Sequence, residues 1–198
     1  MNAARAEVVL ASTSPYRADL LRRVLVDFRI ASAQVDESAH AGERPRQTAM
    51  RLAAEKAGEV AVHHPECLVI GCDQLADLEG QALGKPGTIE PAVAQLRRCS
   101  GRIVEFHTAV CLADTRGGDI VLSEACDLTR VHVRNLDEAE IRRYVARDEP
   151  LDCAGSFKVE QLGIALFERI ESDDPSALVG LPLIALCRLL RAAGVKLP

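Results

Sequence analysis

The chain has 198 residues, a length that suits one domain or one domain with two lobes. It is 48% hydrophobic but only 3% aromatic, so we expect a core of Leu, Val, Ile and Ala. A net charge of −5 without basic runs argues against nucleic acid or an anionic membrane as a partner, and no apolar stretch reaches the roughly 18 residues of a membrane span. Scattered cysteines without a CxxC pair, and the lack of a signal-peptide pattern, favour a cytoplasmic location.

The hydrophobic pattern predicts alternating strands and helices in the first part of the chain. We expect a strand over 7–11, a helix over 15–26, a strand over 28–35, a polar loop over 36–45 and a helix over 46–63. A buried strand follows over 67–72, with Asp73 at its end, at the rim of the sheet.

The later part of the chain holds long strands. We expect a short strand over 81–84, a helix over 89–98, and strands over 102–113 and 119–134 joined at Gly117 and Gly118. A helix over 137–147, a turn-rich segment over 148–160, a strand over 162–170 and a helix over 182–192 complete the chain. The early alternation and the later antiparallel pair together indicate an α/β fold with a mixed sheet.

The stretch VVLASTSPYR, residues 8–17, combines several groups that can bind an anion. A predicted strand ends just before Ser12, Ser14 fits a helix N-cap, and Pro15 fits the first helical position. Hydroxyl groups, free backbone N–H groups and the Arg17 guanidinium then meet at one turn, which suits a phosphate. Taken alone, these residues fit an ordinary capped turn equally well.

Two acidic positions follow predicted strands. Asp73 ends the strand over 67–72, and Asp36 with Glu37 follows the strand over 28–35. Carboxylates beside cations are what magnesium-assisted phosphate chemistry requires, with one carboxylate orienting or deprotonating a water molecule. The alternatives are a turn aspartate held by backbone N–H groups and a solvated loop edge.

Lysine is rare in this chain, since 20 of the 24 basic residues are Arg. Lys56 lies at the edge of a helical apolar stripe, from which its ammonium can reach a cleft. Lys85 is held in extended backbone by Pro86. We interpret both as candidate phosphate contacts, with a surface charge as the alternative for each.

The histidines show no metal-binding spacing along the sequence. His63 and His64 fit the end of a helix, and His107 in a predicted strand is interpreted as structural. The sequence contains no GxSxG, Walker A or GxGxxG motif, so it gives no support to those enzyme classes.

Eight short blocks, in order along nearly the whole chain, carry a further resemblance. They are STSPYR (12–17), DE (36–37), LAAEKA (52–57), GCDQ (71–74), GKP (84–86), SGR (100–102), EPLDCAG (149–155) and VGLPL (179–183). Together they resemble the Maf family of nucleoside triphosphate pyrophosphatases. The resemblance implies a single Maf domain over 1–198 with the inosine-triphosphatase-like fold, an elongated mixed sheet flanked by helices, with two lobes around a central cleft as one option.

The resemblance also implies an activity. It is the hydrolysis of a nucleotide between its α- and β-phosphates with a divalent cation, Mg²⁺ or Mn²⁺, giving a nucleoside monophosphate and diphosphate. The partner is then a small nucleotide, and a homodimer remains one option for the assembly. The implied roles are catalytic proton acceptor for Asp73, metal or water contact for Glu37 with Asp73, and phosphate binding for Ser12, Ser14, Arg17, Lys56 and Lys85.

Three positions depart from the common branch of the family, which acts on dTTP and UTP. They are Tyr16, Gln74 and Glu160, and this trio resembles the branch that hydrolyses 7-methyl-GTP. A Tyr16 ring can stack on a methylated purine, and Glu160 and Gln74 can bond the guanine edge. Lys158 is an alternative partner for Glu160. A pyrimidine or broad-specificity pyrophosphatase, and a nucleotide-binding regulator of septum formation, remain as alternative functions.

Overall fold

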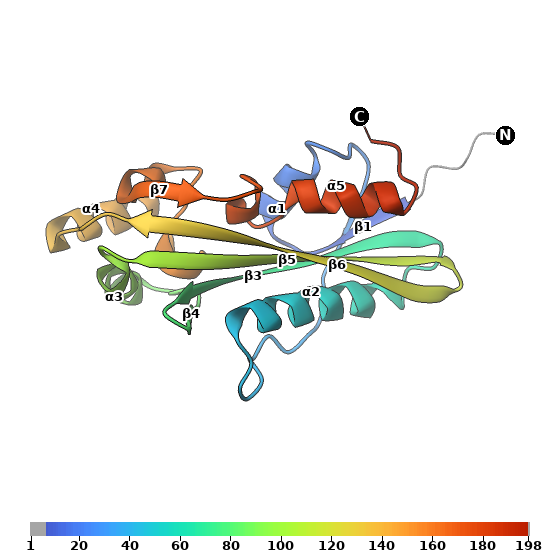
Figure 1. The fold of residues 1–198 in the computed structure, drawn as a ribbon, viewed down its shortest axis with the longest axis horizontal. Helices are drawn as coiled ribbons and strands as arrows, with labels where there is room; N and C mark the ends of the chain where they lie inside the picture. Colours follow the sequence, from blue (N-terminus) through green and yellow to red (C-terminus); the bar gives the residue numbers. More distant parts are fainter. Residues whose placement is uncertain (1–6, 198) are drawn as a thin grey trace.

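The computed structural model describes residues 7–197, in which one mixed sheet of seven strands runs the length of the molecule (Figure 1). The strand order is β2-β1-β3-β5-β6-β7, with β4 paired to β3. β1 lies parallel to β2 and β3, and the remaining pairs are antiparallel. The α/β class with a mixed sheet is therefore confirmed. The strands are β1 (Glu7–Ala11), β2 (Arg29–Ala31), β3 (Cys67–Leu78), β4 (Gln81–Leu83), β5 (Ile103–Gly117), β6 (Asp119–Val133) and β7 (Phe167–Glu171).

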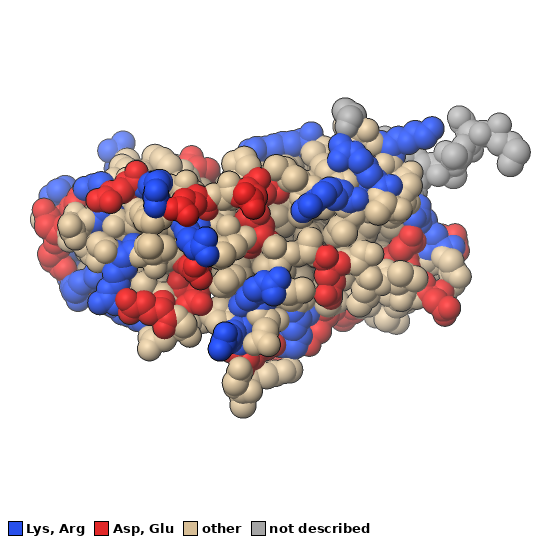
Figure 2. Space-filling view, viewed as in Figure 1, with Lys and Arg blue, Asp and Glu red and all other residues tan. Residues whose placement is uncertain are grey.

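Helices cover both faces of this sheet. In Figure 1, α2 lies against one face, α1 and α5 lie against the other, and α3 and α4 gather near β7 at one end. None of the described helices is both long and apolar enough to cross a membrane. On the face drawn in Figure 2, Lys and Arg are interspersed with Asp and Glu and form no continuous basic area. The helices are α1 (Pro15–Leu21), α2 (Pro45–Ala61), α3 (Ile89–Cys99), α4 (Glu138–Asp148) and α5 (Leu183–Ala192).

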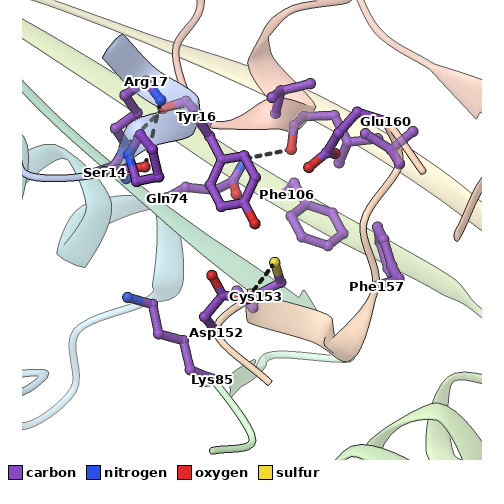
Figure 3. A pocket seen from close by; sticks show the side chains of 16 residues that line it. Ser14, Tyr16, Arg17, Gln74, Lys85, Phe106, Asp152, Cys153, Phe157 and Glu160 are labelled. Atoms are coloured by element: carbon purple, nitrogen blue, oxygen red, sulfur yellow. Dashed lines mark hydrogen bonds between the residues drawn. The ribbon is translucent and has the colours of Figure 1, made fainter. Parts of the chain in front are cut away.

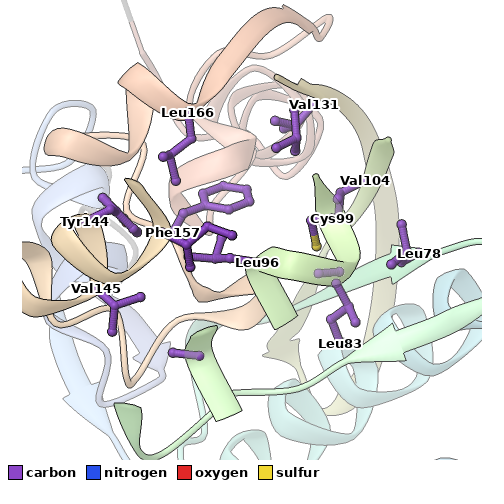
Figure 4. Close-up of a cluster of buried hydrophobic side chains, with 14 of the residues drawn as sticks. Leu78, Leu83, Leu96, Cys99, Val104, Val131, Tyr144, Val145, Phe157 and Leu166 are labelled. Atoms are coloured by element: carbon purple, nitrogen blue, oxygen red, sulfur yellow. The ribbon is translucent and has the colours of Figure 1, made fainter. Parts of the chain in front are cut away.

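The buried hydrophobic residues form three clusters along the sheet. One lies between α2 and the sheet, and one lies between α1, α5 and the opposite face. The third holds α3 and α4 against the far ends of β3 and β5, and includes Leu96, Tyr144 and Phe157 (Figure 4). Aliphatic residues dominate the first two clusters, as the scarcity of aromatic residues predicts.

Helix α2 approaches β3 closely at Gly71. A Cβ atom on Gly71 would lie 2.2 Å from the carbonyl oxygen of Ala53 and 2.5 Å from the backbone nitrogen of Ala57. Real Cβ atoms do not approach backbone atoms this closely, so the contact requires glycine. The missing side chain therefore determines how deeply α2 lies on the sheet, and with it the height of Lys56 above β3.

Several predicted boundaries are wrong. The helix expected over 15–26 ends at Leu21 and continues as turns, and the strand expected over 28–35 is reduced to Arg29–Ala31. The strand expected over 162–170 begins as a 3₁₀ helix, Leu162–Leu166, before β7. The two strands extend only as far as their ladder partners, since β2 pairs with β1 only over Arg29–Ala31 and β7 pairs with β6 only within 167–171. An apolar pattern alone cannot reveal where such pairing stops.

The expectation that Asp73 ends a strand is also wrong. β3 continues to Leu78 because β5 pairs with it without interruption from Leu68 to Asp77. On its other edge, β3 pairs with β1 only as far as Ile70 and with β4 only from Ala76 onward. Residues 71–75 therefore form an uncovered stretch of strand edge between β1 and β4, and Asp73 lies in the middle of it.

Candidate active site

Two adjoining cavities open along the uncovered edge of β3. The larger, of about 420 Å³, is bordered by the ends of β1 and β2, by α2 and by β4. The smaller, of about 220 Å³, extends toward the segment around residues 152–160. Every residue expected to have a catalytic, phosphate-binding, metal-binding or specificity role lines one or both of them. The acidic candidate Asp36 lines neither, and accepts from the Ser38 N–H at 2.9 Å. Ser12, Glu37, Lys56 and Asp73 line the larger, Tyr16 and Glu160 line the smaller, and Ser14, Arg17, Gln74 and Lys85 line both.

A lysine between two carboxylates lies in the larger cavity. The Lys56 Nζ atom is 2.7 Å from Asp73 Oδ1 and 2.6 Å from Glu37 Oε1. The side chains of Lys56 and Asp73 are only 9% and 10% exposed, whereas that of Glu37 is 63% exposed. Asp73 is therefore a buried carboxylate with one charged partner, and Glu37 meets that partner from the solvent side.

Burial and charge act in opposite directions on these groups. Burial raises the pKa of Asp73, against the lowering influence of Lys56 and Arg17. Burial disfavours the Lys56 ammonium, but the nearby carboxylates outweigh it and raise the pKa of Lys56. The hydrogen bond from Lys56 lowers the pKa of Glu37. Asp73 is thus more basic than an ordinary aspartate, which suits a proton acceptor.

The turn after β1 forms the second wall of the larger cavity. Ser14 is the N-cap of α1 and accepts a hydrogen bond from the backbone N–H of Arg17, and Pro15 occupies the first helical turn, as predicted. The Arg17 guanidinium donates to Ser12 Oγ at 3.4 Å and to the Gly180 carbonyl at 3.0 Å. α1 has only seven residues, so side chains rather than a helix dipole are the main source of positive charge here.

The smaller cavity brings an aromatic ring together with polar groups. Figure 3 shows the Tyr16 ring between Gln74 and the loop that carries Asp152, with Glu160 on the far side of the cavity. Phe106 and Phe157 form its apolar end, and their rings pack edge to face. The cavity therefore offers flat apolar surface with acceptor groups at its margin.

Gln74 has a fixed orientation that the sequence did not reveal. Its Nε2 atom donates to Thr108 Oγ1 at 2.9 Å and to the carbonyl oxygens of Ala177 and Leu178 at 2.8 and 3.2 Å. Thr108 is fully buried on β5 and also donates to Ala177. Because the amide nitrogen is engaged, the amide oxygen is the group that Gln74 can offer to a ligand.

The alternative pairing of Lys158 with Glu160 is replaced in the structure by contacts with Asp148 and Asp152. The Lys158 Nζ atom donates to the Asp148 carbonyl at 3.2 Å and lies 3.7 Å from Asp152 Oδ1. Asp152 belongs to the EPLDCAG block and lines the smaller cavity. Glu160 itself is exposed at the margin of the smaller cavity.

The loop that carries Glu37 is anchored by Arg51 of α2. Its guanidinium donates to both carboxylate oxygens of Glu43 and to the Ser38 carbonyl, at 2.8 to 2.9 Å. The hydrogen bonds from Arg51 lower the pKa of Glu43 to about 2. This anchor was not expected, because the pairing joins a loop to a helix and has no local pattern.

The donor set at Asp73 fits a divalent cation. Two carboxylates approach one point, now filled by the Lys56 ammonium, and oxygen ligands are what Mg²⁺ and Mn²⁺ prefer. A cation there would be held by Asp73 and Glu37.

Residues 7–193 match the family described as Maf-like protein. The chain belongs to the Maf family. The seven-stranded mixed sheet with helices on both faces is consistent with the Maf fold.

Curated relatives resemble the chain over nearly its full length. A protein of Xanthomonas campestris pv. campestris is 59% identical over 191 residues, covering 96% of this chain and 98% of its own. A protein of Aromatoleum aromaticum is 53% identical over 192 residues, covering 97% and 98%. One of Albidiferax ferrireducens is 50% identical over 190 residues, covering 96% and 94%. Each of these Maf-family relatives is named 7-methyl-GTP pyrophosphatase.

Proposed function

We propose that this Maf-family chain is a nucleoside triphosphate pyrophosphatase that hydrolyses 7-methyl-GTP to 7-methyl-GMP and diphosphate. The observation that carries the proposal is the buried Asp73 carboxylate beside Lys56 and Glu37, in a cleft that continues into a cavity lined by Tyr16. The names of relatives at 50–59% identity support the same substrate. Such an enzyme removes modified nucleotides from the cell's pool.

The phosphate groups would occupy the larger cavity. Ser12, Ser14 and Arg17 line one wall, and Lys85 lines the margin shared with the smaller cavity. Arg17 is already oriented by the Gly180 carbonyl, so little of its freedom has to be lost when an anion arrives. Lys56 can turn from its carboxylate partners toward a phosphate oxygen. These groups would also stabilise the negative charge of the departing diphosphate.

Asp73 would act as the proton acceptor. A water molecule beside its carboxylate would transfer a proton to a carboxylate oxygen. At the same time, the water oxygen would bond to the α-phosphorus. The bond from that phosphorus to the bridging oxygen then breaks. The raised pKa of Asp73 makes the carboxylate a better base than one in water. A divalent cation held by Glu37 and Asp73 would neutralise phosphate charge and orient the substrate.

The base would occupy the smaller cavity. The Tyr16 ring offers a face for a methylated purine, whose fixed positive charge strengthens stacking. The Gln74 oxygen and the Glu160 carboxylate can accept hydrogen bonds from the guanine N1–H and exocyclic amine. A pyrimidine would leave these acceptors unpaired, at about 1–3 kcal/mol.

A panel of nucleotides tests the proposal. Diphosphate release is measured with Mg²⁺ or Mn²⁺ for 7-methyl-GTP, GTP, dTTP, UTP and CTP. We expect 7-methyl-GTP to have the highest kcat/KM. Equal or faster turnover of dTTP or UTP would favour the pyrimidine or broad-specificity alternative. Binding of nucleotide and metal without turnover would favour the regulator of septum formation.

The cellular location, the partners and the assembly of this enzyme are predictions. We propose a cytoplasmic location with a small nucleotide as the only required partner, and we do not expect nucleic acid or membrane binding. A homodimer is one option for the assembly and would be tested by light scattering. The single domain over 1–198 also stays a prediction, with residues 1–6 and 198 outside the described part of the chain.

A further inference from the structure

A second group of metal-binding side chains lies on the α2 face of the sheet, apart from the cleft. Asp77 of β3 lies directly opposite Glu105 of β5, and His107 is two residues further along β5 on the same face. One potential ligand atom from each of the three lies within 4.8 Å of the others. Asp77 is four positions beyond Asp73, or about 13 Å along the strand, so one ion cannot serve both places.

His107 is buried without a hydrogen bond of ordinary length. The residue is 7% exposed, and its Nδ1 atom has no partner among the described residues. Its Nε2 atom points toward Asp77 Oδ2 at 3.8 Å, which is longer than a hydrogen bond. Buried imidazole nitrogens normally have a partner. A cation between His107 and the carboxylates would give a partner to Nε2, the ring nitrogen that faces Asp77.

Asp77 and Glu105 bring two carboxylates side by side, and one of them, Glu105, forms an ion pair with Arg130. Like charges directly opposite each other on adjacent strands destabilise a sheet. Each is steadied by one protein donor, since Asp77 Oδ1 accepts from the Gly80 N–H at 2.7 Å and Glu105 Oε1 from Arg130 Nε at 2.8 Å. Such outer contacts orient ligating carboxylates, and they leave Asp77 Oδ2 on the side of His107, 3.8 Å from Nε2.

We propose that Asp77, Glu105 and His107 bind a divalent transition-metal cation. One imidazole and two carboxylates, completed by water, suit Zn²⁺, Co²⁺ or Mn²⁺ better than Mg²⁺, which prefers oxygen ligands alone. Burial lowers the pKa of His107 and keeps the ring in the neutral form that a metal requires. Arg46, at the exposed start of α2, adds a nearby positive charge that also lowers the pKa of His107.

The ion would join β3 to β5 where the sheet passes from α2 toward α3. A cation bound only in the folded state stabilises that state. The site is independent of the proposed pyrophosphatase reaction, so either can fail without the other.

Cobalt absorption tests this site directly. The full chain is freed of metal with a chelator and titrated with Co²⁺. Visible absorption reports ligation of the cobalt by imidazole and carboxylate groups, and thermal unfolding reports the stability of the protein. We expect one equivalent bound with visible bands and a raised Tm. His107→Gln should weaken this binding at least tenfold and remove the bands.

Two control variants separate the site from other metal-binding groups. Glu37→Gln alters the proposed catalytic cation site and should leave the bands in place. His132→Gln removes a histidine that bonds Glu171 on the neighbouring strands, at 2.9 Å, and should also leave them unchanged. If His107→Gln does not fold, Glu105→Gln decides by the same titration. The proposal is overturned if the unsubstituted chain gives no visible cobalt bands. It is also overturned if the bands survive in every folded variant in which His107 or Glu105 is replaced.

Discussion

Lys56 determines the electrostatic state of the cleft. Its ammonium is within hydrogen-bond distance of one buried and one exposed carboxylate, and so partly neutralises a site that would otherwise carry two negative charges. Burying a charged group without a partner is strongly unfavourable, so Asp73 and Lys56 depend on each other. Each can be probed by a substitution that removes its charge but keeps its size.

Asp73→Asn keeps the shape of the side chain and removes its ability to accept a proton. We expect kcat for 7-methyl-GTP to fall about 10²–10⁴-fold, the usual contribution of a general base. Diphosphate release measures the loss, and circular dichroism checks that the fold is intact. A loss of tenfold or less in folded protein would count against Asp73 as the base.

Lys56→Met removes a cation that lowers the pKa of Asp73. The Asp73 carboxyl should then hold its proton to higher pH, and it must lose that proton to act as a base. We therefore expect the acidic limb of the kcat/KM profile to move to higher pH. Lys85→Met removes a charge from the same cleft without direct contact with Asp73, and should move the limb less. A limb that stays in place or moves to lower pH in Lys56→Met contradicts this account of Asp73.

Glu160→Gln tests base recognition. The change replaces one carboxylate oxygen with an NH2 group, which is a donor and cannot accept a hydrogen bond from guanine. We expect kcat/KM for 7-methyl-GTP to fall by a factor that corresponds to about 1–3 kcal/mol, with little effect on UTP. Equal losses for both nucleotides would mean that Glu160 does not contact the base.

At the scale of the elements, the contact between α2 and β3 positions the catalytic groups. Gly71 allows the helix backbone to approach the strand, and Lys56 then reaches Asp73 two residues further along β3. The two residues belong to different sequence blocks. Their meeting depends on a helix-to-sheet distance that only a missing side chain permits.

Gly71→Ala should therefore destabilise the protein. The added Cβ has to push α2 away from the sheet, and overpacking of this kind costs about 1–3 kcal/mol. Gly58→Ala is the matched control, because Gly58 lies in the same helix with nothing within 4 Å of an added Cβ. That change should stabilise the helix by up to about 1 kcal/mol. Thermal unfolding measures both, and similar effects for the two variants contradict the packing account.

Local patterns in the sequence predicted most elements but not how they end. The N-cap at Ser14, the long strands β5 and β6 and helix α2 follow from capping residues and periodicity, which are local properties. The length of β3 could not be inferred in this way. An aspartate after six apolar or small residues resembles a strand end, whereas here uninterrupted pairing with β5 continues the strand.

The site residues were predictable for a different reason. Their identities and order match a family pattern, so Ser12, Lys56, Asp73 and Glu160 could be named from the sequence, and the structure places all four at one cleft. Contacts between distant segments were not predictable. The Gln74–Thr108 bond and the Arg51–Glu43 anchor join residues that no local pattern relates. The His107 cluster escaped notice because Asp77 comes from another strand.

For the molecule as a whole, the two cavities predict a joint stabilisation by ligand. A 7-methyl-GTP analogue with a methylene between its α- and β-phosphates should fill both. At one hundred times its Kd, with Mg²⁺, it should raise the free energy of unfolding by about 2.7 kcal/mol. For a chain of this size that is a rise in Tm of about 5–10 °C. The corresponding UTP analogue at the same concentration should give a smaller rise, and an equal rise would contradict the proposed base preference.

The long sheet also limits how this molecule can move. β3 and β5 run from α2 toward α3 and α4 (Figure 1) and pair without interruption from Leu68 to Asp77 of β3. The strands that border the cleft therefore belong to one continuous sheet, and are not divided between two bodies joined by a flexible linker. Narrowing the cleft around a nucleotide would require added twist distributed over many ladder hydrogen bonds.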